Sequence, residues 1–505
     1  MEVALAFRNE KAHHQNNVIV HIMTEQCLQE AFQSPEWFVD GHCEILKAAA
    51  ALNDFNARES EIIFVYPSSE NIPLTVFVGL GPRTLLNARQ FQNAGAALSK
   101  RVSKLNLQHV MLDISGLDNI DPHDMIKPFL EGIAIGAYTF TKYISESKPF
   151  PLGKMTVVIP DYVDKDTATQ AVMDASHNIA ASNIARRLTD EASNYKTPEK
   201  FENLVKDILS KQKYNIFTLD YNALATENLS LIRAVGQAGS DLPRLLIIET
   251  HPFESDFTLG IVGKAVTFDS GGLMIKSHEQ MPYMREDVGG AAAIAGVLSV
   301  IDQLSLNYNL VAAIPIAENL IDSKSYRPSD VCITRNGHSI EINNTDAEGR
   351  LLLADSFIYL QDKYKLNLLI DVATLTGAIV RALGSKMAGY FTNNQYIADQ
   401  LEIASCKSRE RFWRMPLAKE YDRLLNSTYA DLKNDGGEPK AITAALFLQH
   451  FVNSGLPWLH LDVGGILVPD PNDPLYGGGY FSTGIPTITL IEFLKLLNVT
   501  HPSFK

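Results

Sequence analysis

Short apolar runs rich in β-branched residues alternate with longer stretches of helical periodicity along most of this chain. In the first third, strands are predicted at IIFVYPS, TVFVGLG, VMLDIS and MTVVIP, and amphipathic helices over 83–105 and 122–143. From residue 200 onward, strands are predicted at LLIIET, TLGIVG, NLVAAIPIA, LNLLIDVAT and LPWLHLDVG. Helices are predicted there over 289–304, 350–362, 441–453 and 487–497. This alternation indicates an α/β fold.

The segment 164–189 separates the two sets of elements. It is rich in alanine, contains neither glycine nor proline, and is long enough for one helix. The stretch TDEASNYKTPEKF that follows supplies turn residues and a new helix start. We therefore predict a smaller N-terminal α/β domain over 1–163, a linking helix over 164–189 and a larger α/β domain over 190–505. A chain of 505 residues, 46% of them hydrophobic, can bury the cores that two domains need.

Composition narrows the class of function. The 58 acidic and 44 basic residues give a net charge of -14, which opposes a polyphosphate backbone and argues against nucleic acid as the main partner. The four cysteines are widely spaced and never form CxxC, so the sequence predicts neither a disulfide framework nor a thiolate zinc site. We expect a cytoplasmic protein without an export signal or a membrane span, because Asp371 and Arg381 interrupt the most apolar stretch.

Familiar catalytic motifs are missing from the sequence. The GLG at 79–81 lacks the third glycine of a dinucleotide-binding fingerprint, and HExxH, Walker A and GxSxG are absent. Single histidines such as His278 and His460 are more often satisfied polar residues than ligands. Neither is assigned a role.

The first stretch with concentrated chemistry is VGKAVTFDSGGLMIKSHEQMPYMREDVGGAAAIAG. Lys264 and Asp269 flank a strand-to-loop transition, Lys276 follows, and Asp287 lies just before a glycine pair, Gly289 and Gly290, and an alanine-rich helix. Strand ends are the usual position of active sites in open α/β sheets. These four side chains are therefore candidates for one site.

The second stretch is NNTDAEGRLLLADS. Asp346, Glu348 and Arg350 occupy every second position, so in an extended segment their side chains would face the same way. An apolar helical stretch follows directly. If both stretches meet at neighbouring strand ends, four carboxylates and two lysines converge there.

Four clustered carboxylates repel one another unless they take up protons or bind cations. A pair of divalent ions about 3.5 to 4 Å apart needs bridging carboxylates, and so accounts for the number of acidic groups. Oxygen ligands suit Mg²⁺ or Mn²⁺ and accept Zn²⁺, whereas an amine ligand favours zinc or another transition metal. A lysine coordinates only as the neutral amine, so its pKa, ordinarily about 10.4, would have to fall.

Each of these residues also has a simpler structural explanation. The D-x-E-x-R pattern could complement a helix dipole, Lys264 and Lys276 could be solvated cations, and Asp287 could cap a helix. Their joint occurrence with TFDSGG, in a chain without another catalytic signature, favours the functional interpretation.

The segments VGKAVTFDSGG, MREDVGGAAA, NNTDAEGRLLLAD and DVATLTGA resemble the signature segments of the leucyl aminopeptidase family, the cytosolic dinuclear-metal exopeptidases. The likeness extends from about Asn183 to Phe493. It implies a variable N-terminal α/β domain and a catalytic domain with a mixed central sheet flanked by helices. It also implies a homohexamer of paired trimers that acts on peptide substrates.

The resemblance implies a role for each residue of the two stretches. Asp269 and Glu348 would bridge two metals, Lys264 and Asp287 would complete the tighter site, and Asp346 would serve the more exchangeable one. The implied ions are Zn²⁺ or Mn²⁺, with Mg²⁺ or Co²⁺ as alternatives in the exchangeable site.

The implied reaction releases N-terminal residues, preferably Leu or other neutral or apolar ones, by attack of a metal-activated water. Lys276 would stabilise the oxyanion, and Arg350 would hold a bicarbonate that acts as general base. The residues that would line the pocket for the first side chain are Met284, Thr374, Gly377, Gly464 and Leu467.

Some features depart from the family pattern, and two other classes of function stay open. NDGGEPKAIT brings Pro439 and Lys440 into a loop that is usually glycine-rich, which affects the shape of the pocket rather than a ligand. A catalytically silent relative would be expected to have lost ligands, and none is lost here. A DNA-binding or regulatory role, as in some relatives, is opposed by the net acidity.

Overall fold

The computed structural model describes residues 1–7, 18–33, 42–66, 74–103, 105, 109–114, 117, 120–146, 150, 152–160, 162–250, 255–467, 470, 473, 475–476 and 480–500. The chain divides into two compact units. The first comprises Met1–Ile179 with Asp470–Gly479, and the second comprises Ala180–Pro469 with Tyr480–Lys505.

The first unit contains a six-stranded sheet in the order β1-β6-β5-β2-β4-β3. Only the pairing of β3 with β4 is antiparallel. The strands are β1 (Glu2–Phe7), β2 (Val18–Met23), β3 (Ile62–Val65), β4 (Leu74–Gly79), β5 (His109–Asp113) and β6 (Lys154–Ile159). The helices are α1 (Glu25–Gln33), α2 (His42–Ala51), α3 (Ala88–Val102) and α4 (Pro122–Ala137). All four strands predicted for this part are present, although 67 and 68 of IIFVYPS and 115 of VMLDIS lie outside the described residues.

The limits predicted for the two helices of this unit were too wide. The helix predicted over 83–105 begins at Ala88, because Asn87 and Gln90 form a capping box at its N-terminus. A short 3₁₀ turn, η2 (Arg83–Leu85), precedes it. The helix predicted over 122–143 ends at Ala137. The apolar periodicity of the sequence does not indicate where α3 begins or where α4 ends.

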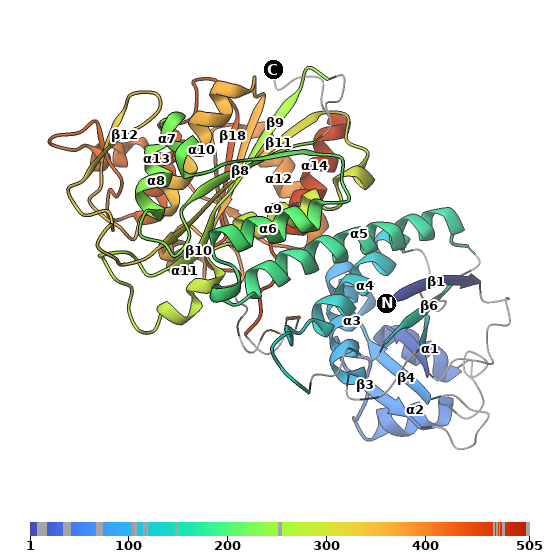
Figure 1. Cartoon of the computed structure of the whole chain (residues 1–505). Coiled ribbons are helices and arrows are strands. Elements are labelled where there is room, and N and C mark those ends of the chain that lie inside the picture. The colour runs from blue at the N-terminus through green and yellow to red at the C-terminus, as the bar shows by residue number, and fades with distance from the viewer. Residues whose placement is uncertain are drawn as a thin grey trace. The chain divides into compact units, whose positions relative to one another are not determined.

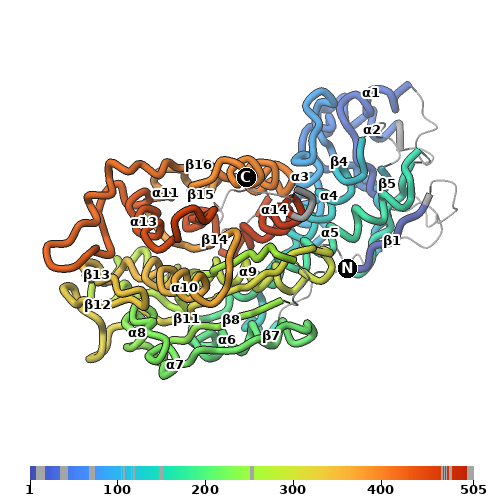
Figure 2. Tube along the Cα trace, turned by 90° about the horizontal axis from the view of Figure 1, so that it is seen from above, coloured from blue at the N-terminus to red at the C-terminus, as the bar shows by residue number. Residues whose placement is uncertain are grey.

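The second unit is built on a mixed sheet, which confirms the predicted fold class. Its strand order is β16-β15-β18-β14-β9-β11-β8-β7, with β10 also paired to β11, and Figure 2 shows β7 and β16 towards opposite sides. The central strands β18, β14, β9 and β11 are parallel, whereas β15, β8 and β7 add antiparallel pairings. The strands are β7 (Asn215–Leu219), β8 (Arg244–Glu249), β9 (Thr258–Gly263), β10 (Ala265–Asp269), β11 (Asn309–Asn319), β14 (Leu368–Ala373), β15 (Ala388–Thr392), β16 (Phe412–Arg414) and β18 (Trp458–Asp462).

Helices cover both faces of this sheet (Figure 1). One face carries α8 (Ser230–Gly236), α10 (Gly349–Lys363) and α13 (Lys440–Gln449), and the other carries α6 (Pro198–Leu209), α9 (Gly289–Leu298) and α14 (Thr487–Thr500). The remaining helices are α7 (Tyr221–Thr226), α11 (Gly377–Leu383) and α12 (Gln395–Ser408). In the predicted stretch 289–304, α9 ends at Leu298 and a 3₁₀ turn follows at Ile301–Leu304.

The composition of α9 reflects its close approach to the sheet. All ten of its residues are buried, and a Cβ at Gly290 would lie 2.0 Å from the carbonyl oxygen of Val372 in β14. Only a residue without a side chain allows this approach. The glycine pair after Asp287 therefore fixes where α9, and with it Asp287, meets the sheet.

The segment predicted as a linking helix forms α5 (Lys165–Asp190). The division between the compact units falls within this helix, between Ile179 and Ala180. The domain limits inferred from the sequence remain a prediction. Among the described residues, no helix is both long enough and apolar enough to cross a membrane.

A small third sheet, which the sequence did not predict, organises one side of the second unit. It contains β12 (Val331–Ile333), β13 (Ser339–Glu341) and β17 (Leu432–Lys433). Ile340 pairs with Leu432 and Glu341 with Lys433. This register brings the residues after β13 beside those after β17, although about 90 residues separate them in the chain.

Asp355 of α10 is a fully buried carboxylate that anchors a neighbouring helix. Its Oδ2 accepts hydrogen bonds from the backbone N–H groups of Leu231 (2.8 Å) and Ile232 (3.0 Å) at the start of α8. Its Oδ1 has no hydrogen-bond partner among the described residues. Burial raises the pKa of Asp355 to about 7, and the two N–H donors only partly offset this rise.

This raised pKa predicts a pH-dependent stability. Since the folded value exceeds the unfolded value of about 3.9, the protonated carboxyl contributes stability that is complete below about pH 4 and lost as pH rises through 7. Asp355→Asn keeps an oxygen acceptor and cannot ionise. The difference in free energy of unfolding, variant minus wild type, should therefore increase by a few kcal/mol between about pH 4 and pH 8.

Urea unfolding at several pH values measures this difference, with Asp207→Asn, an exposed change in α6, as the control. A difference between wild type and Asp355→Asn that does not vary with pH would contradict the prediction.

Candidate metal centre

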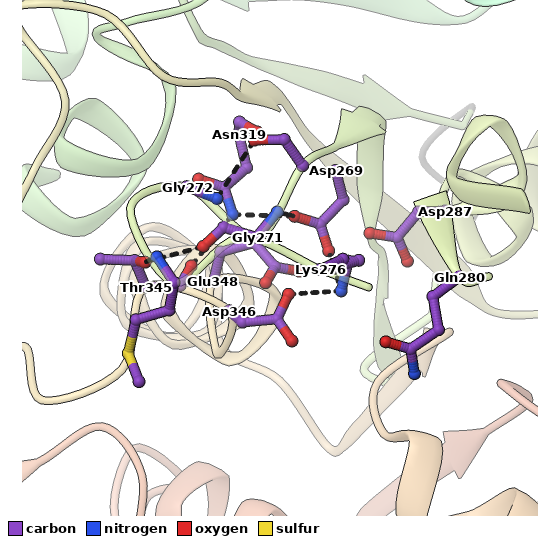
Figure 3. Close-up of polar contacts among 12 residues, drawn as sticks. Asp269, Gly271, Gly272, Lys276, Gln280, Asp287, Asn319, Thr345, Asp346 and Glu348 are labelled. Atoms are coloured by element: carbon purple, nitrogen blue, oxygen red, sulfur yellow. Dashed lines mark hydrogen bonds and ion pairs between the residues drawn. The ribbon is translucent and has the colours of Figure 1, made fainter. Parts of the chain in front are cut away.

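Three carboxylates converge where β10 ends and α10 begins (Figure 3). Asp269 is the last residue of β10, Glu348 is at the N-cap position of α10, and Asp346 precedes Glu348 by two residues. One carboxylate oxygen from each lies within 4.8 Å of the others, which is close enough to hold a metal ion. Glu348 makes no side-chain capping bond to its helix, so helix capping does not explain its position.

The geometry of this convergence differs from the one expected. Residues 345 and 346 form a turn, and Glu348 has helical backbone angles at the start of α10, so this is not an extended segment. An extended conformation was therefore the wrong reason to expect their convergence, although the Asp346 and Glu348 side chains do lie close together. The turn brings them together because the chain reverses there and then starts a helix.

Lys264 lies between two of the predicted ligands. Its Nζ is 2.8 Å from Asp287 Oδ1 and 2.8 Å from Glu348 Oε1, and the side chain is only 2% exposed. The same Nζ donates to the carbonyl oxygen of Thr374 at 2.9 Å. A Cβ at Gly349 would lie 2.7 Å from this Nζ, so the glycine leaves room for the lysine. Lys264 is therefore not a solvated strand end.

Lys276 approaches the other side of the cluster. Its Nζ lies 2.7 Å from Asp269 Oδ2 and also donates to Asp346 Oδ1. The side chain is mostly buried, so the alternative of a surface cation does not hold. The two lysines thus contact all four predicted carboxylate ligands.

Asp287 ends the 3₁₀ helix η4 (Met281–Glu286) and does not cap α9, where Val288 occupies the N-cap position. Its Oδ1 accepts a hydrogen bond of 2.5 Å from the hydroxyl of Thr374, in addition to the contact with Lys264. Its Oδ2 is buried and has no hydrogen-bond partner among the described residues. The carboxylate thus presents one oxygen that is free for a further ligand.

Burial and mutual repulsion dominate the electrostatics of the cluster. Burial, together with the charge of Glu348, raises the pKa values of Asp269 and Asp346. Burial alone would lower the pKa values of Lys264 and Lys276, but the neighbouring carboxylates raise both above the ordinary value. Burial would raise the pKa of Glu348, yet the two lysines lower it. The site therefore concentrates negative charge that cations must balance.

Arg350, in the first turn of α10, is 4% exposed. Its Nη1 donates to the carbonyl oxygen of Asn434 at 2.8 Å and lies 3.8 Å from Asp435 Oδ1. Its Nε is buried without a hydrogen-bond partner among the described residues. Burial lowers the pKa of Arg350, partly offset by Asp435, Glu348 and other acidic neighbours. The guanidinium thus has an unused donor close to the cluster.

Two asparagines that position this site were not identified from the sequence. The side chain of Asn434 accepts from the N–H of Asn343 (2.9 Å) and donates to the carbonyl oxygens of Asn344 (2.7 Å) and Ala347 (3.2 Å). Asn319, at the end of β11, donates to Asp269 Oδ1 (2.8 Å). The only signal for Asn319 was its place after a buried apolar strand, and Asn434 required the unpredicted pairing of β13 with β17.

The five predicted pocket residues belong to several different segments of the second unit. Thr374 contacts Asp287, and Leu467 packs so closely on Gly289 that a Cβ there would lie 2.2 Å from a Leu467 methyl. Gly377 is exposed at the start of α11, and Met284 is half-buried in η4. Gly464 follows β18 and donates to Asp462.

Asp462 also fixes the loop that carries Thr374. Its carboxylate accepts hydrogen bonds from the N–H of Leu375 (3.1 Å) and the hydroxyl of Thr376 (2.7 Å). Sequence reasoning did not identify Asp462. The loop after β14 is therefore held from β18, the adjacent strand of the sheet.

Both parts of the chain match known protein families. Residues 183–491 match the catalytic domain of the cytosol aminopeptidase family, and residues 19–147 match its N-terminal domain. A probable cytosol aminopeptidase of Rhizobium johnstonii is 34% identical over 447 residues, covering 86% of this chain and 89% of that protein. One of Clostridium perfringens is 33% identical over 468 residues, covering 91% and 94%.

Solved structures agree with this assignment. The bottromycin maturation enzyme BotP in complex with Mn superposes with a TM-score of 0.84 at 30% identity, covering 96% of this chain and all of that one. A mutant of tomato leucine aminopeptidase gives a TM-score of 0.86 at 26% identity, covering 98% and 96%.

The chain therefore belongs to the cytosol aminopeptidase family. Members of this family are hydrolases that remove residues from the N-termini of peptides with the help of divalent metal, so the chain is a metallo-aminopeptidase. The resemblance found in the sequence is confirmed.

Gly349→Ala should disturb the centre without removing a ligand. The added Cβ would lie 2.7 Å from Lys264 Nζ and would push the amine away from Asp287 and Glu348. We expect hydrolysis of Leu-p-nitroanilide to fall by about 10- to 100-fold, the cost typical of displaced support around a metal site. Metal content and activity of the purified variant measure this effect. Wild-type activity at wild-type metal content would show that the position of Lys264 does not matter.

Proposed function

We propose that this enzyme releases N-terminal residues, preferably Leu or other neutral and apolar ones, from peptides with a pair of divalent ions bound in this centre. The observation that carries the proposal is the convergence of Asp269, Asp346 and Glu348 within 4.8 Å, flanked by Lys264 and Asp287. This donor set suits divalent ions, because carboxylate oxygens accept Zn²⁺, Mn²⁺ and Mg²⁺, and Lys264 would add affinity for transition metals once a bound dication displaces its proton.

We assign the residues as the family resemblance implies. Asp269 and Glu348 serve both ions, Lys264 and Asp287 complete the tighter position, and Asp346 serves the exchangeable one. Burial supports this division, since Asp346 is the exposed member of the three clustered carboxylates. Zn²⁺ or Mn²⁺ are the proposed ions, with Mg²⁺ or Co²⁺ as alternatives at the exposed position. A Mn complex of BotP, a structural relative, supports the choice of manganese for this chain.

When bound, such a pair of ions supplies a water of lowered pKa and polarises the peptide carbonyl. Lys276, whose ammonium reaches between Asp269 and Asp346, is positioned to stabilise the negative charge that develops on the carbonyl oxygen. The described residues that contact the cluster include no histidine and no glutamate other than Glu348. An external base is therefore the simplest proposal.

Arg350 is the proposed holder of that base, a bicarbonate ion. The unpartnered Nε of this buried guanidinium can donate to an anion, and a planar fork of donors matches a planar oxyanion. The N-terminus of α10 adds positive potential at the same place. The contact of Arg350 with the Asn434 carbonyl holds the guanidinium in position.

The remaining proposals concern the first-residue pocket and the assembly. Met284, Thr374, Gly377, Gly464 and Leu467 are small or largely apolar, which suits Leu-like side chains and predicts broad neutral specificity, since one methylene changes binding by only about 1 to 3 kcal/mol. A cytoplasmic homohexamer is proposed from the family resemblance. Retention of all five predicted ligands argues against a catalytically silent relative.

Metal removal provides the first test. Hydrolysis of Leu-p-nitroanilide should disappear after chelation and return with Mn²⁺ or Zn²⁺. Glu348→Ala should lose more than about 100-fold in kcat with either ion, because losses at residues that only support ligands already reach 10- to 100-fold.

Glu420→Ala, a change at an exposed position of the same unit, serves as the matched control and should keep wild-type activity. Full activity in the presence of chelator, or in Glu348→Ala, would refute the dinuclear proposal. An inactive but folded wild-type protein under every metal would favour the silent relative.

Bicarbonate dependence tests the role of Arg350 separately. In buffer freed of carbon dioxide, added bicarbonate should raise the activity of the wild type, whereas Arg350→Ala should be slow and should not respond. General-base assistance is typically worth about 10²- to 10⁴-fold, which sets the scale of the loss. A wild-type rate independent of bicarbonate would exclude this base and leave the metal assignment intact.

A further inference from the structure

We propose that Asn319 is a positioning residue that decides which oxygen of Asp269 is available to the metals. The inference rests on the proposed function, because it concerns the same centre. It assigns a role to a residue that is not itself a predicted ligand. Asn319 ends β11, whose residues pair in parallel with β10, and the two strands bring Asn319 directly beside Asp269.

The two oxygens of Asp269 have different partners (Figure 3). Oδ1 accepts one hydrogen bond from Asn319 Nδ2 at 2.8 Å and a second from the N–H of Gly271 at 2.9 Å. Oδ2 instead faces the Lys276 ammonium at 2.7 Å. Oδ1 is thus directed into the protein, and Oδ2 faces the interior of the carboxylate cluster.

The orientation of the Asn319 amide follows from its acceptors. Nδ2 donates both to Asp269 Oδ1 and to the carbonyl oxygen of Thr345, at 3.0 Å. The Thr345 carbonyl can only accept, and Asp269 Oδ1 already accepts from the N–H of Gly271, so the NH₂ group and not the amide oxygen fits between them. The opposite amide oxygen, Oδ1 of Asn319, is buried and has no hydrogen-bond partner among the described residues. The amide oxygen of Asn319 thus lacks a hydrogen bond, whereas the NH₂ group makes two.

These contacts restrict the coordination of Asp269. A carboxylate whose Oδ1 already accepts two hydrogen bonds is poorly suited to bind a metal through both oxygens. Asn319 therefore leaves Oδ2 as the oxygen that would be available to the ions, and it fixes the plane of the carboxylate. Orientation of a ligand by a neighbouring hydrogen bond is the usual way in which proteins tune a metal site.

The second bond of Asn319 extends this effect to Asp346. Thr345 is adjacent to Asp346, and its carbonyl also accepts a bond of 2.6 Å from the Tyr326 hydroxyl. The Thr345 hydroxyl donates to the carbonyl oxygen of Gly271, so the turn before α10 is tied to the loop after β10. One NH₂ group thus connects two segments that carry predicted ligands, Asp269 and Asp346.

Two variants of Asn319 test this inference. Asn319→Ala removes the amide and leaves space, whereas Asn319→Leu removes the amide, keeps similar volume and eliminates the unpaired oxygen. Asn393→Ala is the matched control, because Asn393 uses its amide to bond the backbone of Leu456 and Trp458 outside the centre.

The measurements are Mn²⁺ affinity by competition with a chromophoric chelator, Mn²⁺ stoichiometry, and the EPR spectrum at two Mn²⁺ per chain. The spectrum reports magnetic coupling through the bridging groups. We expect both Asn319 variants to bind Mn²⁺ about 10- to 100-fold more weakly and to show altered coupling. At saturating Mn²⁺ they should lose kcat with little change in KM. The control should match the wild type in all of these.

Wild-type affinity and an unchanged spectrum in Asn319→Leu would overturn the inference. A lowered thermal midpoint of the metal-stripped variants with wild-type affinity would do the same, because the role would then be structural only. A wild-type protein that binds no metal would refute the proposed function instead, so the two failures are distinguishable.

Discussion

The repulsion between buried carboxylates is the constraint on which the rest of the second unit depends. Asp269, Asp287 and Glu348 are almost completely excluded from solvent, and Asp346 lies beside them. A stable fold can bury such charges only where cations and hydrogen-bond donors lie against them. Two lysines and several fixed donors meet that demand. Four carboxylates against two lysines leave a net negative charge, which supports the proposed binding of divalent ions there.

Support for this cluster comes from rigid elements and not from the ligands themselves. Gly290 lets α9 approach β14, Gly349 leaves space for Lys264, and Asp462 holds the loop of Thr374 from the adjacent strand. Asn319 and Asn434 hold the turn before α10 from two further directions. Each contact joins segments far apart in the chain. The geometry of the centre therefore depends on the sheet, which brings these distant segments together.

The sequence predicted the mixed α/β architecture, nine of the eighteen strands of the described residues and the two stretches that carry the candidate ligands, because apolar periodicity and clustered charge are local signals. Helix ends such as Ala88 and Ala137 were misplaced, since caps and packing decide them. The small sheet of β12, β13 and β17 was missed because its strands are only two or three residues long. Asn319 and Asn434 were also not predicted, because their hydrogen-bond partners are distant in sequence. A single asparagine gives no sequence pattern that would indicate its role.

The contact between Arg350 and Asn434 has a consequence for how this part of the chain can evolve. The guanidinium donates to the main-chain carbonyl of Asn434 and lies 3.8 Å from the carboxylate of Asp435, and both residues precede the stretch 436–440. A carbonyl is present whatever residue occupies the position. The composition of 436–440 can therefore drift while the path of the backbone is retained, and an unusual loop sequence is compatible with an unaltered partner for the arginine.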